Sequence, residues 1–247
     1  MANFRGPNLK IQRAKKHISE LHHEVATYIA RHPYRMVVQQ DTDPGYYCWV
    51  LRITEEIPEQ LSVIIGDVVH NLRATLDLLA CELVRLNGAD THNVYFPFSA
   101  DQNGFEDAIH VRHMDRAAPD VVNMIRLLKP YHGGNEALRG LHDLDIIDKH
   151  KLLIPCSHFT GIPNLEIQNE SKTTAAIISC RVGLVQDGQC VMRTPIAKNI
   201  KIGQEFDAAF TMTFGEGPFN AKPIVQTLRE LTELVVEIVS TFERHCP

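Results

Sequence analysis

The segment from Pro58 to Leu86 constrains the fold more than any other part of the chain. Apolar residues recur along it at helical spacing, Pro58 suits the first helical position, and Asn87-Gly88 suits a helix exit. At 1.5 Å per residue such a helix would be roughly 43 Å long. One apolar stripe runs along it, formed by Leu61, Ile65, Val68, Leu72, Leu76, Leu79, Leu83 and Leu86. The segment therefore predicts a long central helix that the rest of the protein buries.

The rest of the chain combines helical and strand-like patterns and predicts an α+β fold. Further amphipathic helices are expected at residues 8–31, 101–112, 119–129, 135–154 and 222–245. Two β-prone runs around a turn signal at 41–45 predict an N-terminal hairpin over 34–54. Residues 155–215 are rich in Val, Ile, Thr, Phe and Gly, with Asp187-Gly188 as a hairpin signal, and predict a mainly antiparallel sheet. We expect one domain over 1–247: a long-helix bundle to about 154 that includes the hairpin, then the strand-rich part, then the closing helix.

The composition is typical of a globular cytoplasmic protein. A net charge of -5 and a pI near 6.2 give no general attraction to nucleic acid. No run approaches the roughly 20 uninterrupted apolar residues that a membrane helix needs, and no apolar signal-peptide core is seen. The six cysteines are scattered without a Cys-x-x-Cys pair, so we expect reduced thiols and no structural disulfide. The sequence contains no nucleotide-binding motif, no Gly-x-Ser-x-Gly motif and no His-Glu-x-x-His motif, so we assign no cofactor and no metal.

A polar group lies on the other side of the long helix. His70, Arg73 and Asp77 fall within about 60° of one another and are flanked by apolar and small residues rather than by Lys and Glu. A face with so few solvating side chains predicts burial. Arg73 could there bind a carboxylate or a phosphate, or it could pair with Asp77 along the helix, a contact worth about 0.2 to 0.5 kcal/mol at a surface. We favour the structural interpretation.

Two carboxylates interrupt the apolar stripe of the helix expected at 135–154. Asp145 and Asp148 share an arc with its leucines. Because an ionised carboxylate is costly to bury alone, each should meet a cation, a capping amide or a metal ion. Arg73 and His70 are the natural protein partners, and we favour an ion-pair network between helices over a functional site. A weaker metal-ligand pattern at helical spacing is formed by Glu106, His110 and His113.

Four ordered blocks resemble a widespread family of uncharacterised bacterial proteins. They are His70–Ala80 (HNLRATLDLLA), Tyr95–Phe98 (YFPF), Lys129–His132 (KPYH) and Asp148–Lys151 (DKHK), where the family shows HNLRxxLDxLA, FPI, QPY and DKHR. The last three blocks differ from the family pattern by one residue each. The resemblance spans most of the chain and implies a bacterial, cytoplasmic protein, but it brings no activity with it.

A looser resemblance is to the HEPN helical ribonucleases, which pair an arginine with a histidine a few residues later on a helix that meets its dimer mate. Arg73 matches the arginine and Asn71 a nearby polar residue, but Leu78 stands where the histidine belongs. His70 or His150 would have to replace it in space. This departure puts metal-independent ribonuclease chemistry in doubt.

Three function hypotheses follow from these patterns. The first is a non-enzymatic binding or interaction module, and the second is a HEPN-like ribonuclease or defence-associated protein using Arg73 with a nearby histidine. A metal hydrolase built on Asp145 and Asp148 ranks third. The partner is not identified, and a homodimer is left open. The candidate polar cluster comprises His70, Asn71, Arg73, Asp77, Asp145, Asp148, Lys149 and His150.

Overall fold

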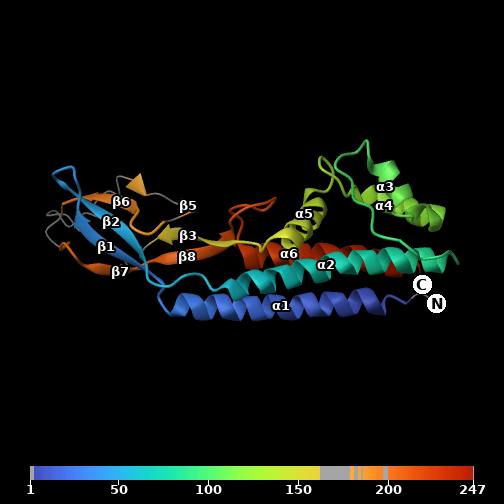
Figure 1. The fold of residues 1–247 in the computed structure, drawn as a ribbon, viewed down its shortest axis with the longest axis horizontal. Helices are drawn as coiled ribbons and strands as arrows, with labels where there is room; N and C mark the ends of the chain where they lie inside the picture. Colours follow the sequence, from blue (N-terminus) through green and yellow to red (C-terminus); the bar gives the residue numbers. More distant parts are fainter. Residues whose placement is uncertain (1–2, 162–178, 181–182, 185, 197–199, 247) are drawn as a thin grey trace.

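Long helices at one end and β-sheets at the other give the molecule an elongated shape (Figure 1). The computed structural model describes residues 3–161, 179–180, 183–184, 186–196 and 200–246. Three long helices run side by side: α1 (Arg5–Ala30), α2 (Glu59–Leu86) and α6 (Ile224–His245). The shorter helices cover the other side of α2 and α6: α3 (Phe105–Val111), a 3-10 turn (Met114–Arg116), α4 (Pro119–Leu128) and α5 (Glu136–His150). The expected α+β fold is confirmed.

Helix α2 is the central helix of the bundle, as its leucine pattern predicts. The stripe from Leu61 to Leu83 is at most 1% exposed at every position, whereas Leu86 at the helix end is half-buried. Residues on its other side, including Asn71 and Arg73, are buried as well. Helices α1 and α6 cover one side of α2, and α5 covers another. Burial on two sides explains why so few charged residues occur along this helix.

The strands form two antiparallel sheets. The larger sheet has the order β4-β6-β2-β1-β7 and the smaller one the order β5-β3-β8. Strands β1 and β2 pair from Tyr34 opposite Ile53 to Gln40 opposite Tyr47, which confirms the N-terminal hairpin. The strands are β1 (Tyr34–Gln40), β2 (Tyr46–Ile53), β3 (Pro155–Gly161), β4 (Ser179–Cys180), β5 (Gly183–Leu184), β6 (Cys190–Pro195), β7 (Glu205–Asp207) and β8 (Ala209–Phe214).

The turn expected at Asp187-Gly188 is present, and of the two arms expected at 181–186 and 189–195 the second is strand β6, whereas the first lies partly outside the described residues. Gly188 has φ of 77°, and the amide of Gln189 donates to the carbonyl of Gln186 at 3.2 Å. Strand β6 pairs with β4 and β2, however, whereas β5 belongs to the other sheet. The turn signal is local, but the choice between two sheets depends on tertiary contacts that the turn residues do not encode.

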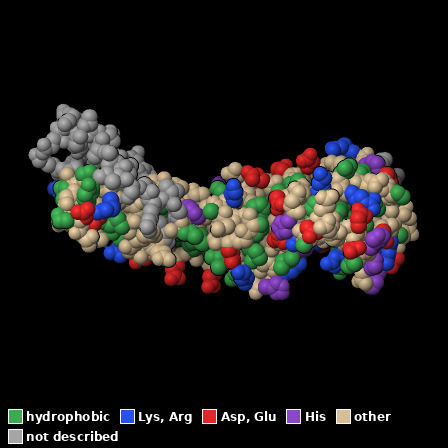
Figure 2. All heavy atoms as spheres, turned by 90° about the horizontal axis from the view of Figure 1, so that it is seen from above, with side chains coloured by type: hydrophobic (Ala, Val, Ile, Leu, Met, Phe, Trp, Pro, Cys, Tyr) green, Lys and Arg blue, Asp and Glu red, His purple; other side chains and the backbone are tan. Residues whose placement is uncertain are grey.

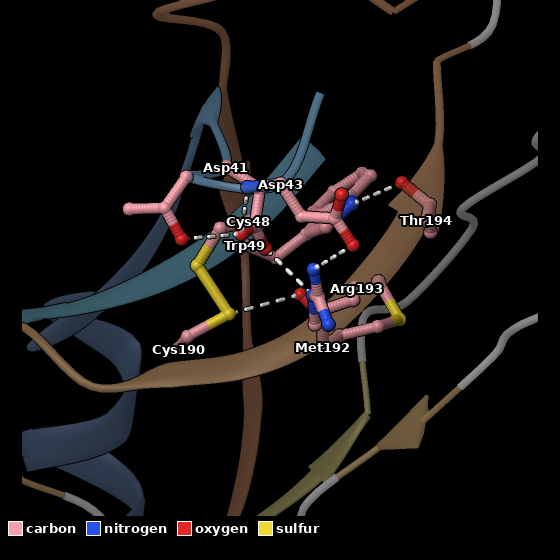
Figure 3. The surroundings of a disulfide bond; sticks show 9 residues. Asp41, Asp43, Cys48, Trp49, Cys190, Met192, Arg193 and Thr194 are labelled. Atoms are coloured by element: carbon pink, nitrogen blue, oxygen red, sulfur yellow. Dashed lines mark hydrogen bonds and ion pairs between the residues drawn. A yellow bond between two sulfur atoms is a disulfide. The ribbon is translucent and has the colours of Figure 1, made fainter. Parts of the chain in front are cut away.

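The expectation that all cysteines are reduced is wrong for one pair. Cys48 of β2 and Cys190 of β6 form a disulfide across a sequence separation of 142 residues, with their Cα atoms 5.8 Å apart (Figure 3). The antiparallel pairing of β2 with β6 brings them together, and sequence spacing gives no sign of it. Among the other cysteines whose side chains are described, Cys81, Cys156 and Cys246 are free.

No helix in the described part of the chain combines the length and apolarity that crossing a lipid bilayer requires.

Candidate functional site

The Arg73 guanidinium is the centre of the polar contacts between α2 and α5. Arg73 is only 8% exposed. Its Nη1 lies 2.6 Å from Asp77 Oδ1, its Nε donates to His142 Nδ1 at 3.3 Å, and its Cζ lies 4.6 Å from the centroid of the Phe98 ring. One cation thus has an ion pair, a hydrogen bond and a cation–π contact. The expected pairing of Arg73 with Asp77 is confirmed.

Asp77 also fixes the segment that follows α2. Its Oδ1 accepts a hydrogen bond from the backbone amide of Phe96 at 2.9 Å. Residues 94–99, which we call the connector, have no regular secondary structure, and Val94, Phe96 and Phe98 along it are buried. The segment therefore packs into the protein without forming a strand. Asp77 therefore joins the helix to the connector as well as to Arg73.

His142 of α5 completes this group and is held in its neutral form. Its ring stacks on Phe98, with centroids 4.4 Å apart and an angle of 4° between the planes. Burial, followed by the charges of Arg73 and Arg139, lowers the pKa of His142 to about 3. Since Arg73 Nε is a donor, Nδ1 of the neutral ring must accept and the proton must reside on Nε2.

A second arginine ties α5 to the connector. Arg139 donates through Nη1 to the carbonyl of Ser99 at 2.6 Å and through Nη2 to Asp143 Oδ1 at 2.7 Å. On the other side of that carboxylate, His132 Nε2 lies 3.3 Å from Asp143 Oδ2. Arg73 and Arg139 thus contact two neighbouring residues of the connector, Phe98 and Ser99.

Asp145 and Asp148 lie in a separate group and do not meet Arg73. The side chain of Asp145 is 3% exposed, and its carboxylate contacts Lys149 Nζ at 2.5 Å and His70 Nδ1 at 3.7 Å. Asp148 lies over Gly66 of α2, where a Cβ atom would collide with its carboxylate. Burial, followed by the charges of Asp145 and Asp67, raises the pKa of Asp148. Asp145 has its cation on its own helix, which is the pairing that the spacing to Lys149 allows.

The two remaining candidates lie apart from both groups. Asn71 donates to the carbonyl of Asp67 at 2.7 Å and accepts from Lys10 Nζ of α1 at 3.3 Å, so it faces the neighbouring long helix. His150 is exposed at the last position of α5. The eight candidates therefore divide among four places rather than forming one site.

Sequence reasoning missed His142, the histidine that meets Arg73. A signal for it exists, because at 100° per residue His142 lies about 40° from Leu138 and about 60° from Asp145, inside the buried arc of α5. Phe98 was seen only as part of a sequence block. Its role as the ring on which both Arg73 and His142 stack depends on the path of the connector, which no helical period describes.

The comparisons leave the family open. No protein-family model, curated protein or solved structure matches this chain. The resemblance to the bacterial family and to the HEPN proteins therefore stays a prediction.

The weaker metal-ligand pattern is not assembled. Glu106 makes two hydrogen bonds to Arg126, His110 contacts Asp115 at 3.0 Å, and His113 lies at the start of the 3-10 turn with φ of 57°. In the described part of the chain, the group of His, Cys, Asp and Glu side chains with converging ligand atoms lies elsewhere, at Asp41, Cys48 and Cys190.

An apolar groove occurs between α4 and α6, away from the Arg73 group. It holds about 350 Å³ and includes Leu127, which is 78% exposed. Its lining is formed by Met124, Leu127, Leu128, Asn135, Leu234, Glu237, Ile238, Thr241 and Phe242. None of the candidate polar residues is among them, so the groove is separate from the polar groups between the helices.

Proposed function

We propose that this protein is a non-enzymatic binding or interaction protein in which Arg73 and its partners hold α2, α5 and the connector together. The observation that carries the proposal is the burial of the guanidinium among protein groups: Asp77, His142 and Phe98 contact it, and Arg73 is only 8% exposed. Removing one partner of a buried ion pair leaves an uncompensated charge, so Arg73 is expected to matter for the folded structure.

The shape of the molecule supports a role in binding. Its accessible surface of 13195 Å² exceeds the roughly 11,100 Å² expected for a compact protein of this mass. Figure 2 shows charged side chains of both signs and several histidines gathered over the helical end. Val111 and Leu127, which are 67% and 78% exposed, add large apolar side chains at α3 and α4. An extended molecule with such a mixed surface suits contact with a partner.

The alternative is a HEPN-like ribonuclease, and one observation favours it. Arg73 and His142 do converge, with Nε and Nδ1 3.3 Å apart, although they come from different helices. A catalytic histidine must exchange a proton near the working pH, however. A pKa of about 3 leaves His142 unable to act as a general acid at neutral pH and makes it a weak base. The pair is therefore better suited to a structural role.

Two measurements on the same variants decide between these functions. Arg73→Leu and His142→Gln are compared with wild type for cleavage of a mixed-sequence RNA and for the free energy of unfolding in urea. The structural role predicts no RNA cleavage by wild type and a loss of about 1.5 to 3 kcal/mol in Arg73→Leu, because hydrogen bonds to a charged group are lost. RNA cleavage that wild type shows and both stably folded variants lack would establish the ribonuclease.

The matched control is Arg126→Leu. Arg126 also pairs with a carboxylate, Glu106, but its side chain is 42% exposed. Exposed pairs contribute about 0 to 1 kcal/mol, so this variant should lose much less stability than Arg73→Leu. Equal losses at the two positions would remove the evidence for a buried structural centre at Arg73.

A further inference from the structure

Three side chains with metal-binding atoms meet in the larger sheet, among β1, β2 and β6. Asp41 follows β1, Cys48 belongs to β2 and Cys190 begins β6, and their ligand atoms all lie within 4.8 Å of one another (Figure 3). In Figure 1 these strands form the end of the molecule opposite the chain termini. The group is therefore separate from the Arg73 cluster and from the proposed function.

The fold itself brings these residues together. The pairing of β2 with β6 sets the Cα atoms of Cys48 and Cys190 5.8 Å apart. The backbone amide of Asp41 donates to the carbonyl of Tyr46, which closes the β1–β2 turn over the same strands. Arg193 of β6 donates to Asp41 Oδ2 at 2.6 Å and so holds the turn against β6.

The Asp41 carboxylate is fixed in place before any ligand arrives. Its Oδ1 accepts hydrogen bonds from Thr42 Oγ1 at 3.1 Å and from the Asp43 amide at 3.0 Å, while Oδ2 accepts from Arg193. A carboxylate oxygen has two lone-pair sites, so Oδ2, which accepts one hydrogen bond here, keeps one for a metal ion. Hydrogen-bonded carboxylates of this kind are the usual arrangement around protein metal sites, because outer contacts orient the ligand.

The donor set matches zinc in both chemistry and charge. Thiolate sulfur and carboxylate oxygen are both zinc ligands, and a tetrahedral ion with Zn–S bonds of about 2.3 Å would separate two sulfurs by roughly 3.8 Å. Neighbouring strands that bring two sulfurs into bonding contact can reach that separation by side-chain rotation. Two thiolates, Asp41 and the Arg193 guanidinium together carry a charge of about -2, which one divalent ion neutralises.

We propose that Cys48 and Cys190 form a redox-gated zinc site with Asp41. In the oxidised state the two sulfurs form the disulfide and cannot bind metal. A dithiol reductant of the thioredoxin class donates two electrons and two protons, giving two thiols here and a disulfide in the reductant. One Zn²⁺ then binds both sulfurs and the carboxylate, two thiol protons pass to solvent, and the fourth ligand position stays open.

The test is a metal titration of the full chain in two redox states. Protein reduced with a non-chelating phosphine and desalted without oxygen is titrated with Zn²⁺ against a chromophoric chelator, and then with Co²⁺. The expected result is one tightly bound ion per chain and a thiolate-to-cobalt charge-transfer band in the reduced protein, and neither in the oxidised protein. A reduced wild type without this band overturns the proposal.

Five single variants and one double variant locate the site. Cys48→Ser and Cys190→Ser should each lose the charge-transfer intensity of a two-thiolate ion, and Cys156→Ser should keep it. Asp41→Asn should weaken zinc binding by about tenfold or more, whereas Asp43→Asn should not, because Asp43 contacts Arg193 but offers no atom to the group. Unchanged affinity in Asp41→Asn, or tight binding of one ion by the reduced Cys48→Ser/Cys190→Ser double variant, overturns the assignment. Circular dichroism under reducing conditions confirms that each variant is folded.

Discussion

At His142, the environment decides the charge of a single side chain. The ring stacks on Phe98 and accepts a hydrogen bond from a buried arginine, so protonating it would place two cations in contact. The folded protein therefore keeps the ring neutral. At low pH this lowers the free energy of unfolding, because the unfolded chain can protonate His142 and the folded protein cannot.

We predict a pH dependence that belongs to His142. Its pKa falls from 6.5 in the unfolded chain to about 3 in the folded protein, so below pH 6.5 the unfolded state binds a proton that the folded state does not. The free energy of unfolding should therefore decrease as the pH falls from about 6.5 towards 3, by up to about 1.4 kcal/mol per pH unit from this group. Urea unfolding at pH 7 and pH 5 measures it.

His142→Gln separates this contribution from that of the carboxylates. The variant lacks the titrating group, so its loss of stability between pH 7 and pH 5 should be smaller than that of wild type. Identical losses in the two proteins would show that His142 has an ordinary pKa and that the buried contact with Arg73 does not keep it neutral.

Gly66 marks the closest approach between α2 and α5. A Cβ atom there would collide with the Asp148 carboxylate, whereas at Gly6 of α1 it would meet Leu78 Cδ1 at an ordinary 3.6 Å. We predict that Gly66→Ala costs about 1 to 3 kcal/mol, because Asp148 must move within a half-buried contact. Gly6→Ala meets no such collision and should cost less than about 1 kcal/mol, the small remaining cost coming from the following Pro7.

A double variant identifies the cause of the Gly66 effect. Replacing Asp148 with serine in the Gly66→Ala background removes the colliding oxygen atoms and should recover part of the lost stability. Chemical denaturation of the single and double variants gives the coupling. If Gly66→Ala is tolerated as well as Gly6→Ala, the two helices are not in the close contact that the structure shows.

Most helices and strands could be predicted from the sequence, but the contacts between them could not. The leucine stripe predicts α2, and the turn at Asp41–Gly45 predicts the first hairpin, because period and turn chemistry are local. The helix expected to reach 154 ends at His150, since Lys151 adopts an extended conformation on the way to Pro155 and β3. The meeting of Arg73 with His142 depends instead on how α2 and α5 are placed in space.

At the scale of the helix, we predict that the stability cost of shortening a leucine on α2 depends strongly on its position. Leu76 is 0% exposed and Leu78, two residues later, is 39% exposed. Leu76→Ala should lower the free energy of unfolding by about 2 to 5 kcal/mol, because it leaves a cavity in the core. Leu78→Ala is the control and should cost less than about 1 kcal/mol. Similar costs at the two positions, measured in urea, would contradict the central place of α2.

Across the whole molecule, the disulfide and the helix bundle lie at opposite ends. Cys48 and Cys190 join strands of the larger sheet, whereas α1, α2 and α6 extend away from it (Figure 1). A disulfide that closes a long loop stabilises a protein by about 2 to 4 kcal/mol. Because the bond is distant from most of the bundle, its loss should first lower the local stability of the strands that it connects.

We predict that reduction speeds amide hydrogen exchange in β2 and β6 and leaves the central part of α2 unchanged. Oxidised and reduced protein, each with a chelator so that no metal binds, are compared by exchange and mass spectrometry. The reduced strands should exchange faster because β6 then loses its covalent link to β2 and keeps only noncovalent contacts, such as the backbone pairing with β2 and β4 and the bond from Arg193 to Asp41. The Cys48→Ser/Cys190→Ser variant is the control and should give the same exchange with and without reductant. Equal acceleration in α2 and in the strands would mean that the two ends unfold together and that the disulfide stabilises the molecule as a single cooperative unit.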